Sequence, residues 1–224
     1  MNFIRSKWRP YLIEYNVTGY FLQNSPKIII AVYTIKNNYK VFLHLYKALV
    51  RSILEYGNAV WSPHKMKHIE LLESVQRRAT RTVPELKGLS YEDRLRTLNL
   101  PTLVYRRLRG DMIEAFKIVQ NIYDPKVAPV LSFRENSTLR GHSKTLSKSR
   151  CIRKLRSNCF TQRITNSWNS LPENVISAPS VNAFKNRLDK LWNNQEVKFN
   201  YKATLQPRKY TKCEFNAELD IEEP

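Results

Sequence analysis

The chain is poor in residues that several familiar kinds of site require. Its 224 residues include only five glycines and three cysteines. The scarcity of glycine excludes a glycine-rich phosphate-binding loop and argues against an all-β fold with many tight turns. Three cysteines give no disulfide framework, and so small and odd a number favours a reducing compartment.

Long apolar runs are absent as well. No stretch approaches the ~18 apolar residues of a membrane-spanning helix. The first ten residues, MNFIRSKWRP, lack the apolar region of a signal peptide. We therefore expect an intracellular protein, nuclear or cytoplasmic, that is not secreted.

Acidic residues are few relative to basic ones. Nineteen Asp and Glu stand against 38 Lys and Arg, which gives a formal net charge of +19 at pH 7. This excess attracts polyanions, so nucleic acid is the expected partner and an acidic membrane surface is the competing one. We favour nucleic acid and expect no membrane partner.

The acids are not arranged for nucleotidyl transfer. A two-metal site needs paired carboxylates, but the only adjacent acids are Glu92-Asp93, at an expected helix start, and Glu222-Glu223, near the end of the chain. The three cysteines and His142 do not have the spacing of a zinc site. We therefore expect no enzyme activity, no metal and no cofactor.

Helical spacing covers much of the chain. Apolar residues recur every three or four positions, the pattern of an amphipathic helix, with one helix expected over about 41–56 and a second over about 65–82. The residues expected to face inward are Val41, Leu45, Leu49, Ile53 and Tyr56 in the first helix, and Ile69, Leu72, Val75 and Ala79 in the second. Ser90 and Ser180 are expected to cap later helices. The fold class is therefore mainly α, a helical bundle.

Composition divides the chain into five parts. Residues 1–39 are aromatic-rich without a clear period, and residues 40–125 carry the expected bundle. Residues 126–158 are rich in Ser, Arg and Lys, and we expect a basic extended arm or a short hairpin there. Residues 159–194 carry further helices. Residues 195–224 are polar and end acidic, so we expect a disordered tail.

Basic residues gather in three clusters, two on expected helices and one on the arm. The side chains that we expect to bind nucleic acid are Arg77, Arg78 and Arg81, then Arg106, Arg107 and Arg109, and on the arm Lys144 and Arg153. Arginine binds phosphate oxygens in pairs, and an exposed aromatic ring nearby, such as that of Tyr105, can stack on a base or a sugar. The alternative is a solvated helix face, but such faces usually mix both signs of charge.

Several motifs, in order along the chain, resemble one protein family. They occupy residues 45–63 (LYKALVRSILEYGNAVWSP), 68–80 (HIELLESVQRRAT), 89–113, 140–143 and 168–188. This series resembles the region downstream of the catalytic core in reverse transcriptases of jockey-type non-LTR retrotransposons. The resemblance implies a thumb-like helical bundle and linker that contact template RNA and primer.

The chain departs from that family where the chemistry belongs. The family carries an aromatic-Ala-Asp-Asp metal motif upstream, and residues 1–40 contain no match to it. Ser52 stands where the family often has proline. We therefore expect a non-catalytic fragment of an RNA-directed DNA polymerase that binds RNA or RNA–DNA hybrid, sequence-tolerantly, through phosphates. The alternatives are a host-retained helical protein-interaction module and a retroelement-derived reading frame without function.

Overall fold

The computed structural model describes residues 39–134 and 142–206. Within these ranges the protein is mainly helical, as predicted, and the only β contact is one antiparallel bridge between Phe133 and Leu146. The predictions for the aromatic-rich amino-terminal segment and for residues 207–224 lie outside the described residues. None of the described helices is long and apolar enough to cross a membrane.

The first helical stretch combines α2 (Tyr39–Leu45), a π-helical turn η1 (Tyr46–Arg51) and α3 (Ser52–Glu55). A helix was predicted here, but the face it buries is a different one. The buried residues, which we call the inner row, are Phe42, Tyr46, Val50 and Leu54. The predicted row lies one residue earlier, and its members Leu49 and Ile53 remain 47% and 45% exposed. The predicted inward face is therefore wrong.

The π-helical turn explains how the inner row stays on one side. A four-residue step overshoots one α-helical turn by ~0.4 residue, so a row of such steps drifts around an α-helix. The wider turn of η1 takes up that drift. The inner row also contains a tyrosine with a partner, because the Tyr46 hydroxyl donates to Gln76 Oε1 at 2.8 Å.

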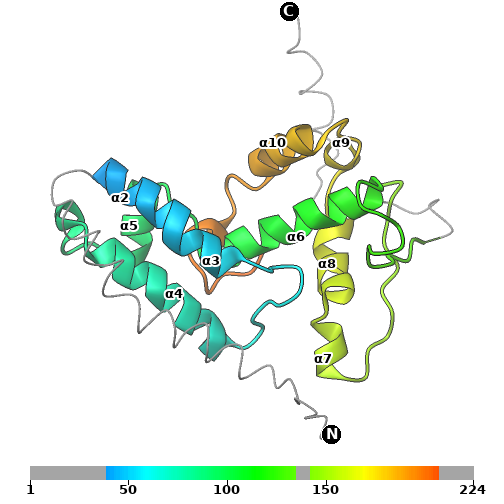
Figure 1. Ribbon diagram of the computed structural model, residues 1–224, viewed down its shortest axis with the longest axis horizontal. Coiled ribbons are helices and arrows are strands. Elements are labelled where there is room, and N and C mark those ends of the chain that lie inside the picture. The colour runs from blue at the N-terminus through cyan, green and yellow to red at the C-terminus, as the bar shows by residue number, and fades with distance from the viewer. Residues whose placement is uncertain (1–38, 135–141, 207–224) are drawn as a thin grey trace, which may run out of the picture.

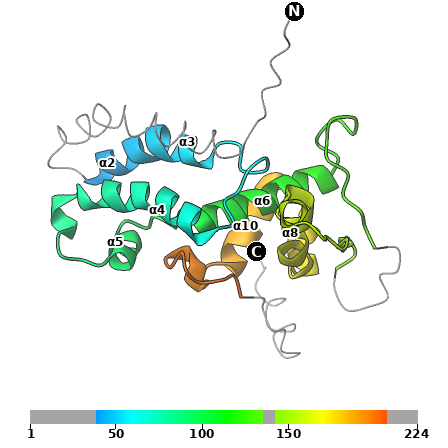
Figure 2. The same cartoon turned by 90° about the horizontal axis from the view of Figure 1, so that it is seen from below.

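Helix α4 (Met66–Arg81) runs beside α2 and α3 (Figures 1 and 2). Its most deeply buried side chains are polar, namely Glu73, Gln76 and Thr80. The apolar residues predicted to face inward are only partly buried: Ile69, Leu72, Val75 and Ala79. Leu72, Val75 and Ala79 nevertheless pack against the core, so this prediction is confirmed in part.

A first core forms where α2, α3, the 3-10 turn η2 (Pro84–Leu86), α5 (Tyr91–Thr97) and the start of α6 (Leu103–Val119) meet. The predicted cap at Ser90 is confirmed, because its hydroxyl accepts from the Asp93 amide at 3.2 Å. Thr102 caps α6 in the same way.

Helix α6 continues into a second core, so it joins the two ends of the molecule (Figure 1). There it packs against α8 (Phe160–Asn169), α9 (Glu173–Ile176) and α10 (Val181–Leu191). Phe184 of α10 stacks on Phe116 of α6 with ring centroids 4.3 Å apart. The predicted cap at Ser180 is confirmed.

The basic arm is attached to this second core. One antiparallel bridge joins Phe133 to Leu146, and α7 (Lys154–Ser157) follows. Residues 135–141, which decide between the predicted extended arm and short hairpin, lie outside the described residues. Trp168 donates from Nε1 to the Lys144 carbonyl at 2.9 Å, and the Asn169 amide bonds both backbone groups of Leu146. Three residues of the arm are buried, namely Leu131, His142 and Leu146.

The expected disordered tail does not begin at 195. Residues 195–206 are packed, with a 3-10 turn η3 (Glu196–Lys198) and a fully buried Val197. The Thr102 amide donates to the Lys198 carbonyl at 2.9 Å, and the Thr102 hydroxyl donates to the Val197 carbonyl at 2.6 Å. The order of this segment places the rings of Phe199 and Tyr201 beside basic side chains of α5 and α4.

Candidate nucleic-acid interface

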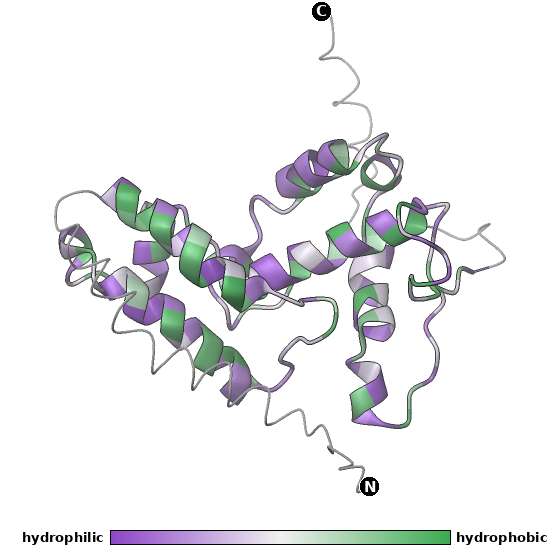
Figure 3. Cartoon of the chain, viewed as in Figure 1, coloured by the Kyte–Doolittle hydropathy of each residue, from purple (hydrophilic) through white to green (hydrophobic). Residues whose placement is uncertain are grey.

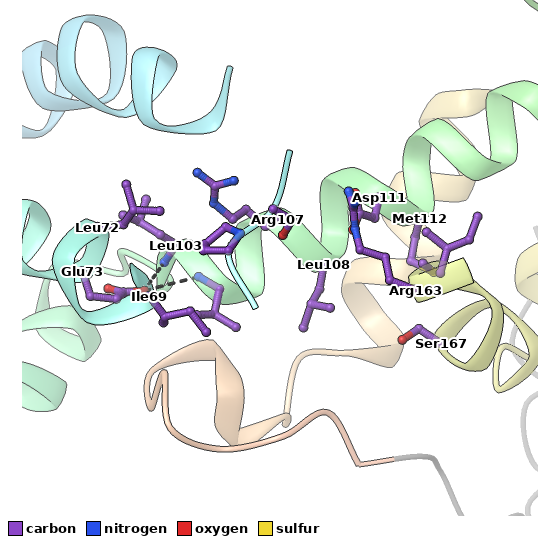
Figure 4. Close-up of a pocket in the computed structure, with 14 residues that line it drawn as sticks. Ile69, Leu72, Glu73, Leu103, Arg107, Leu108, Asp111, Met112, Arg163 and Ser167 are labelled. Carbon is purple, nitrogen blue, oxygen red and sulfur yellow. Dashed lines mark hydrogen bonds and ion pairs between the residues drawn. The ribbon is translucent and has the colours of Figure 1, made fainter. Parts of the chain in front are cut away.

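Glu73 fixes α4, α5 and α6 relative to one another. One carboxylate oxygen accepts from the Tyr91 hydroxyl at 2.7 Å. The other accepts from the amides of Leu103 and Val104 at 2.7 and 3.3 Å (Figure 4). These amides open α6 and have no partner within the helix, so a carboxylate is well suited to them. Burial raises the pKa of Glu73, while these hydrogen bonds oppose the rise.

Arg77 lies on the outer side of this network, between two tyrosine rings. Its guanidinium carbon is 5.2 Å from the centroid of Tyr91 and 5.6 Å from that of Tyr201. It also donates to the Tyr201 hydroxyl at 2.9 Å. Arg77 therefore ties α4 to both α5 and the segment that follows η3.

Further cations pair with aromatic rings on the same side. Arg96 lies 5.0 Å and Lys198 5.4 Å from the ring centroid of Phe199, and Lys202 lies 6.0 Å from that of Tyr201. We call this surface the basic–aromatic cluster. Its members are Arg77, Arg81, Arg94, Arg96, Lys198 and Lys202, with Tyr91, Phe199 and Tyr201. Arg78 is exposed beside the cluster on α4.

The cluster carries positive charge that carboxylates do not offset. Across the described ranges, none of its cations forms an ion pair with Asp or Glu. The crowding affects Arg94, whose pKa is lowered first by burial and then by the charges of Arg81 and Arg77. Arg94 is held in place by the Leu89 carbonyl and the Thr80 hydroxyl. Such a surface is suited to binding a polyanion.

The second predicted cluster has a different role. Arg106 forms a two-pronged ion pair with Glu55, with both distances 2.8 Å, and Arg109 forms one with Asp189 at 2.6 and 2.7 Å. Arg107 is buried and donates to the carbonyls of Leu54 and Trp61. The structure thus commits all three arginines to contacts within the protein, and we leave them out of the candidate interface.

Tyr105 was expected to be exposed beside these arginines and available for stacking. Instead it is 4% exposed and packs edge-on against Trp192, with ring centroids 6.1 Å apart. That expectation is wrong.

The third predicted cluster lies far from the first. Lys144 is half-buried and Arg153 is exposed just before α7. Both belong to the arm, at the other end of α6 from α4 and α5 (Figure 1). The structure therefore brings together only Arg77, Arg78 and Arg81 of the eight predicted residues.

An open cavity of about 190 Å³ lies between α4, α6 and α8, and its walls are mostly apolar (Figure 4). Its charged groups are already engaged. Arg163 holds Asp111 at 2.8 and 2.9 Å, and Asn58 donates to the same carboxylate at 2.9 Å. Burial still raises the pKa of Asp111. We therefore assign this cavity to the packing of α6 rather than to a ligand.

Metal chemistry has no donor set in the part of the chain that the structure describes. No three His, Cys, Asp or Glu side chains gather there closely enough to hold a metal ion. Among the described cysteines, Cys151 and Cys159 are free.

Sequence reasoning missed the contribution of residues 198–202. The signal was present as the alternation of basic and aromatic residues in Lys198-Phe-Asn-Tyr-Lys202. Its place within a polar stretch hid it, because polar composition predicted disorder. The anchor is Val197, which is fully buried in the second core.

No protein-family model, no curated protein and no solved structure matches this chain.

Proposed function

We propose that the protein binds RNA or RNA–DNA hybrid through its phosphate backbone, as a non-catalytic fragment derived from a retrotransposon reverse transcriptase. The observation that carries the binding proposal is the basic–aromatic cluster, in which five cations contact three rings, Arg81 lies nearby, and no carboxylate within the described ranges forms an ion pair with any of the six. The derivation from a reverse transcriptase rests on the motif series in the sequence alone.

The chemistry of the cluster favours single strands or flexible backbones. Arginine forks bind phosphate oxygens, and exposed ring faces accept bases of any identity. Arg77 and Tyr201 are each partly exposed, so a strand that lies along α4 can contact both. Contacts of this kind give binding with little dependence on sequence and a steep dependence on salt.

A salt titration of two matched variants tests the proposal. Arg78→Gln/Arg81→Gln removes two exposed charges beside and within the cluster. Lys185→Gln/Lys190→Gln removes two charges from α10, of which Lys190 is exposed and Lys185 partly exposed. Filter binding to a single-stranded RNA should show that the first variant lowers the slope of log affinity against log salt by about 2. The α10 variant should leave the slope near the wild-type value.

Two results would overturn the proposal. An affinity that does not change with salt excludes phosphate contacts as its source. Equal losses in both variants would mean that net charge, and not the cluster, attracts the nucleic acid.

A further inference from the structure

The helix pair α2 and α3 exposes a row of apolar side chains that the described part of the protein does not cover. We call it the outer row, and its members are Val41, Leu45, Leu49 and Ile53, of which Leu45 is only partly exposed. They follow one another at four-residue spacing, one residue before each member of the inner row. Because the inner row stays on one side of the helix, the outer row forms a continuous stripe beside it. Figure 3 shows hydrophobic residues along both helices.

The stripe exposes more apolar surface than is usual for a helix face in contact with water. Leu49 and Ile53 are 47% and 45% exposed, and Tyr56 and Val60, which follow, are 80% and 88% exposed. Single exposed apolar residues are ordinary, but a contiguous row of them usually marks a contact surface.

We propose that residues 1–38 of the same chain cover the outer row. This segment is joined directly to Tyr39, the first residue of α2, so its carboxyl end is fixed at one end of the stripe. The stripe from Val41 to Ile53 is ~18 Å long on a helix. Thirty-eight residues can reach back along that length in a helical or an extended conformation.

The composition of the segment suits this role. It holds seven aromatic residues: Phe3, Trp8, Tyr11, Tyr15, Tyr20, Phe21 and Tyr33. It also contains the apolar run Ile28-Ile-Ile-Ala-Val32. Burying such side chains against the stripe removes apolar surface from water on both partners, and the covalent link makes the contact intramolecular. The proposal is independent of nucleic-acid binding by the opposite surface of α4 and α5.

A photo-crosslinking experiment on the full chain tests it. Benzoylphenylalanine replaces Leu49, and in the control it replaces Val127, which is 82% exposed at the far end of α6. Unlabelled and nitrogen-15-labelled protein are mixed before illumination, and peptides are identified by mass spectrometry. We expect cross-links from position 49 to residues 1–38 of the same chain, and none to that segment from position 127.

Other occupants give other products. Cross-links between labelled and unlabelled chains would identify a second copy as the cover. Absence of any cross-link to residues 1–38 would leave the segment elsewhere. Either result overturns the proposal.

A second measurement uses Leu49→Glu/Ile53→Glu in the full chain. Both positions are exposed, so the core is not disturbed. Hydrogen exchange within residues 1–38 should accelerate by about tenfold when the apolar cover is lost, while exchange in α6 stays at its wild-type rate. Unchanged exchange in the segment would contradict the proposal.

Discussion

Two arginine triplets that look alike in the sequence have opposite fates in the structure. Arg77, Arg78 and Arg81 lie on α4 among tyrosines, and no carboxylate pairs with them in the described ranges. Arg106, Arg107 and Arg109 open α6 and are all engaged, two of them by carboxylates and one by backbone carbonyls. Each triplet places three arginines on a short stretch of one helix.

The difference comes from tertiary position. Helix α6 crosses the middle of the molecule, so its side chains meet α3 on one side and α10 on the other. Glu55 and Asp189 reach it from those helices. In the described ranges, Arg77 on α4 instead meets Tyr91 of α5 and Tyr201 of the segment after η3. A basic cluster is thus available to a ligand only where the fold brings no acid to it.

The largest expected effect concerns the buried member of the second triplet. Arg107→Met removes the donors to the carbonyls of Leu54 and Trp61 and the contact of the guanidinium with the Trp61 ring at 4.4 Å. Two carbonyls that lose their donors should cost about 3 kcal/mol of unfolding free energy. Urea denaturation measures this loss, with Arg78→Ala as the control, for which we expect less than ~0.5 kcal/mol. Equal stability of the two variants would remove the structural contrast between the triplets.

The next effect concerns Tyr201, an aromatic partner that the first triplet has through Arg77. Tyr201→Ala removes a stacking surface and the acceptor of an Arg77 hydrogen bond. Loss of one base–aromatic stack should weaken binding of single-stranded RNA by about 2 kcal/mol and affect a duplex less. Filter binding with both ligands measures it. Tyr201→Phe keeps the ring, and Tyr123→Ala removes a partly exposed tyrosine elsewhere, so both should bind nearly normally.

A smaller effect concerns Glu73, a carboxylate that interacts electrostatically with Arg77 of the first triplet. The carboxylate oxygens of Glu73 accept hydrogen bonds from Tyr91 and from the first amides of α6, and burial raises the pKa of Glu73. Because the folded state holds a proton that the unfolded state has released, stability falls as pH rises from the unfolded pKa through the raised folded pKa. Glu73→Gln should make this fall in stability smaller, and Asp111 should retain its own share.

Denaturation at a series of pH values from 4 upward, at constant ionic strength, measures that change. The same variant should bind RNA with the wild-type salt slope, because Glu73 is buried and forms no ion pair with Arg77 in the described ranges. A steeper slope in Glu73→Gln would show instead that this carboxylate offsets Arg77.

Much of the architecture could be predicted from the sequence, because apolar spacing and capping residues are local signals. The spacing located the helices, and Ser90 and Ser180 were correctly identified as caps. The inward face of α2 and α3 could not be assigned, because the inner and outer rows have the same four-residue spacing. The choice depends on a π-helical turn and on a partner for Tyr46 that lies thirty residues away.

The candidate site was harder to predict, because an arginine is available to a ligand only if no carboxylate from a distant part of the sequence pairs with it. Glu55 and Asp189 are 51 and 80 residues from the arginines that they engage. No local pattern could have identified these pairs. Residues 198–202 were missed for the converse reason, since their order depends on Val197 and Thr102, which are far apart in sequence.

The smallest expected effect tests whether ion pairing with carboxylates is the only reason why the two triplets differ. Glu55→Gln removes the carboxylate that holds Arg106 and also contacts Arg51 at 3.3 Å. Arg51 and Arg106 then repel each other without a carboxylate between them. The Arg106 side chain, which is 26% exposed, becomes available to a phosphate. We expect a loss of about 0.5 kcal/mol in stability and a salt slope for RNA binding that is steeper by up to about 1. Glu114→Gln, which frees Lys117 from its pair on the same helix, is the charge-matched control. A slope that stays unchanged in Glu55→Gln would mean that the neighbouring rings, and not only the absence of acids, make the α4 triplet a binding surface.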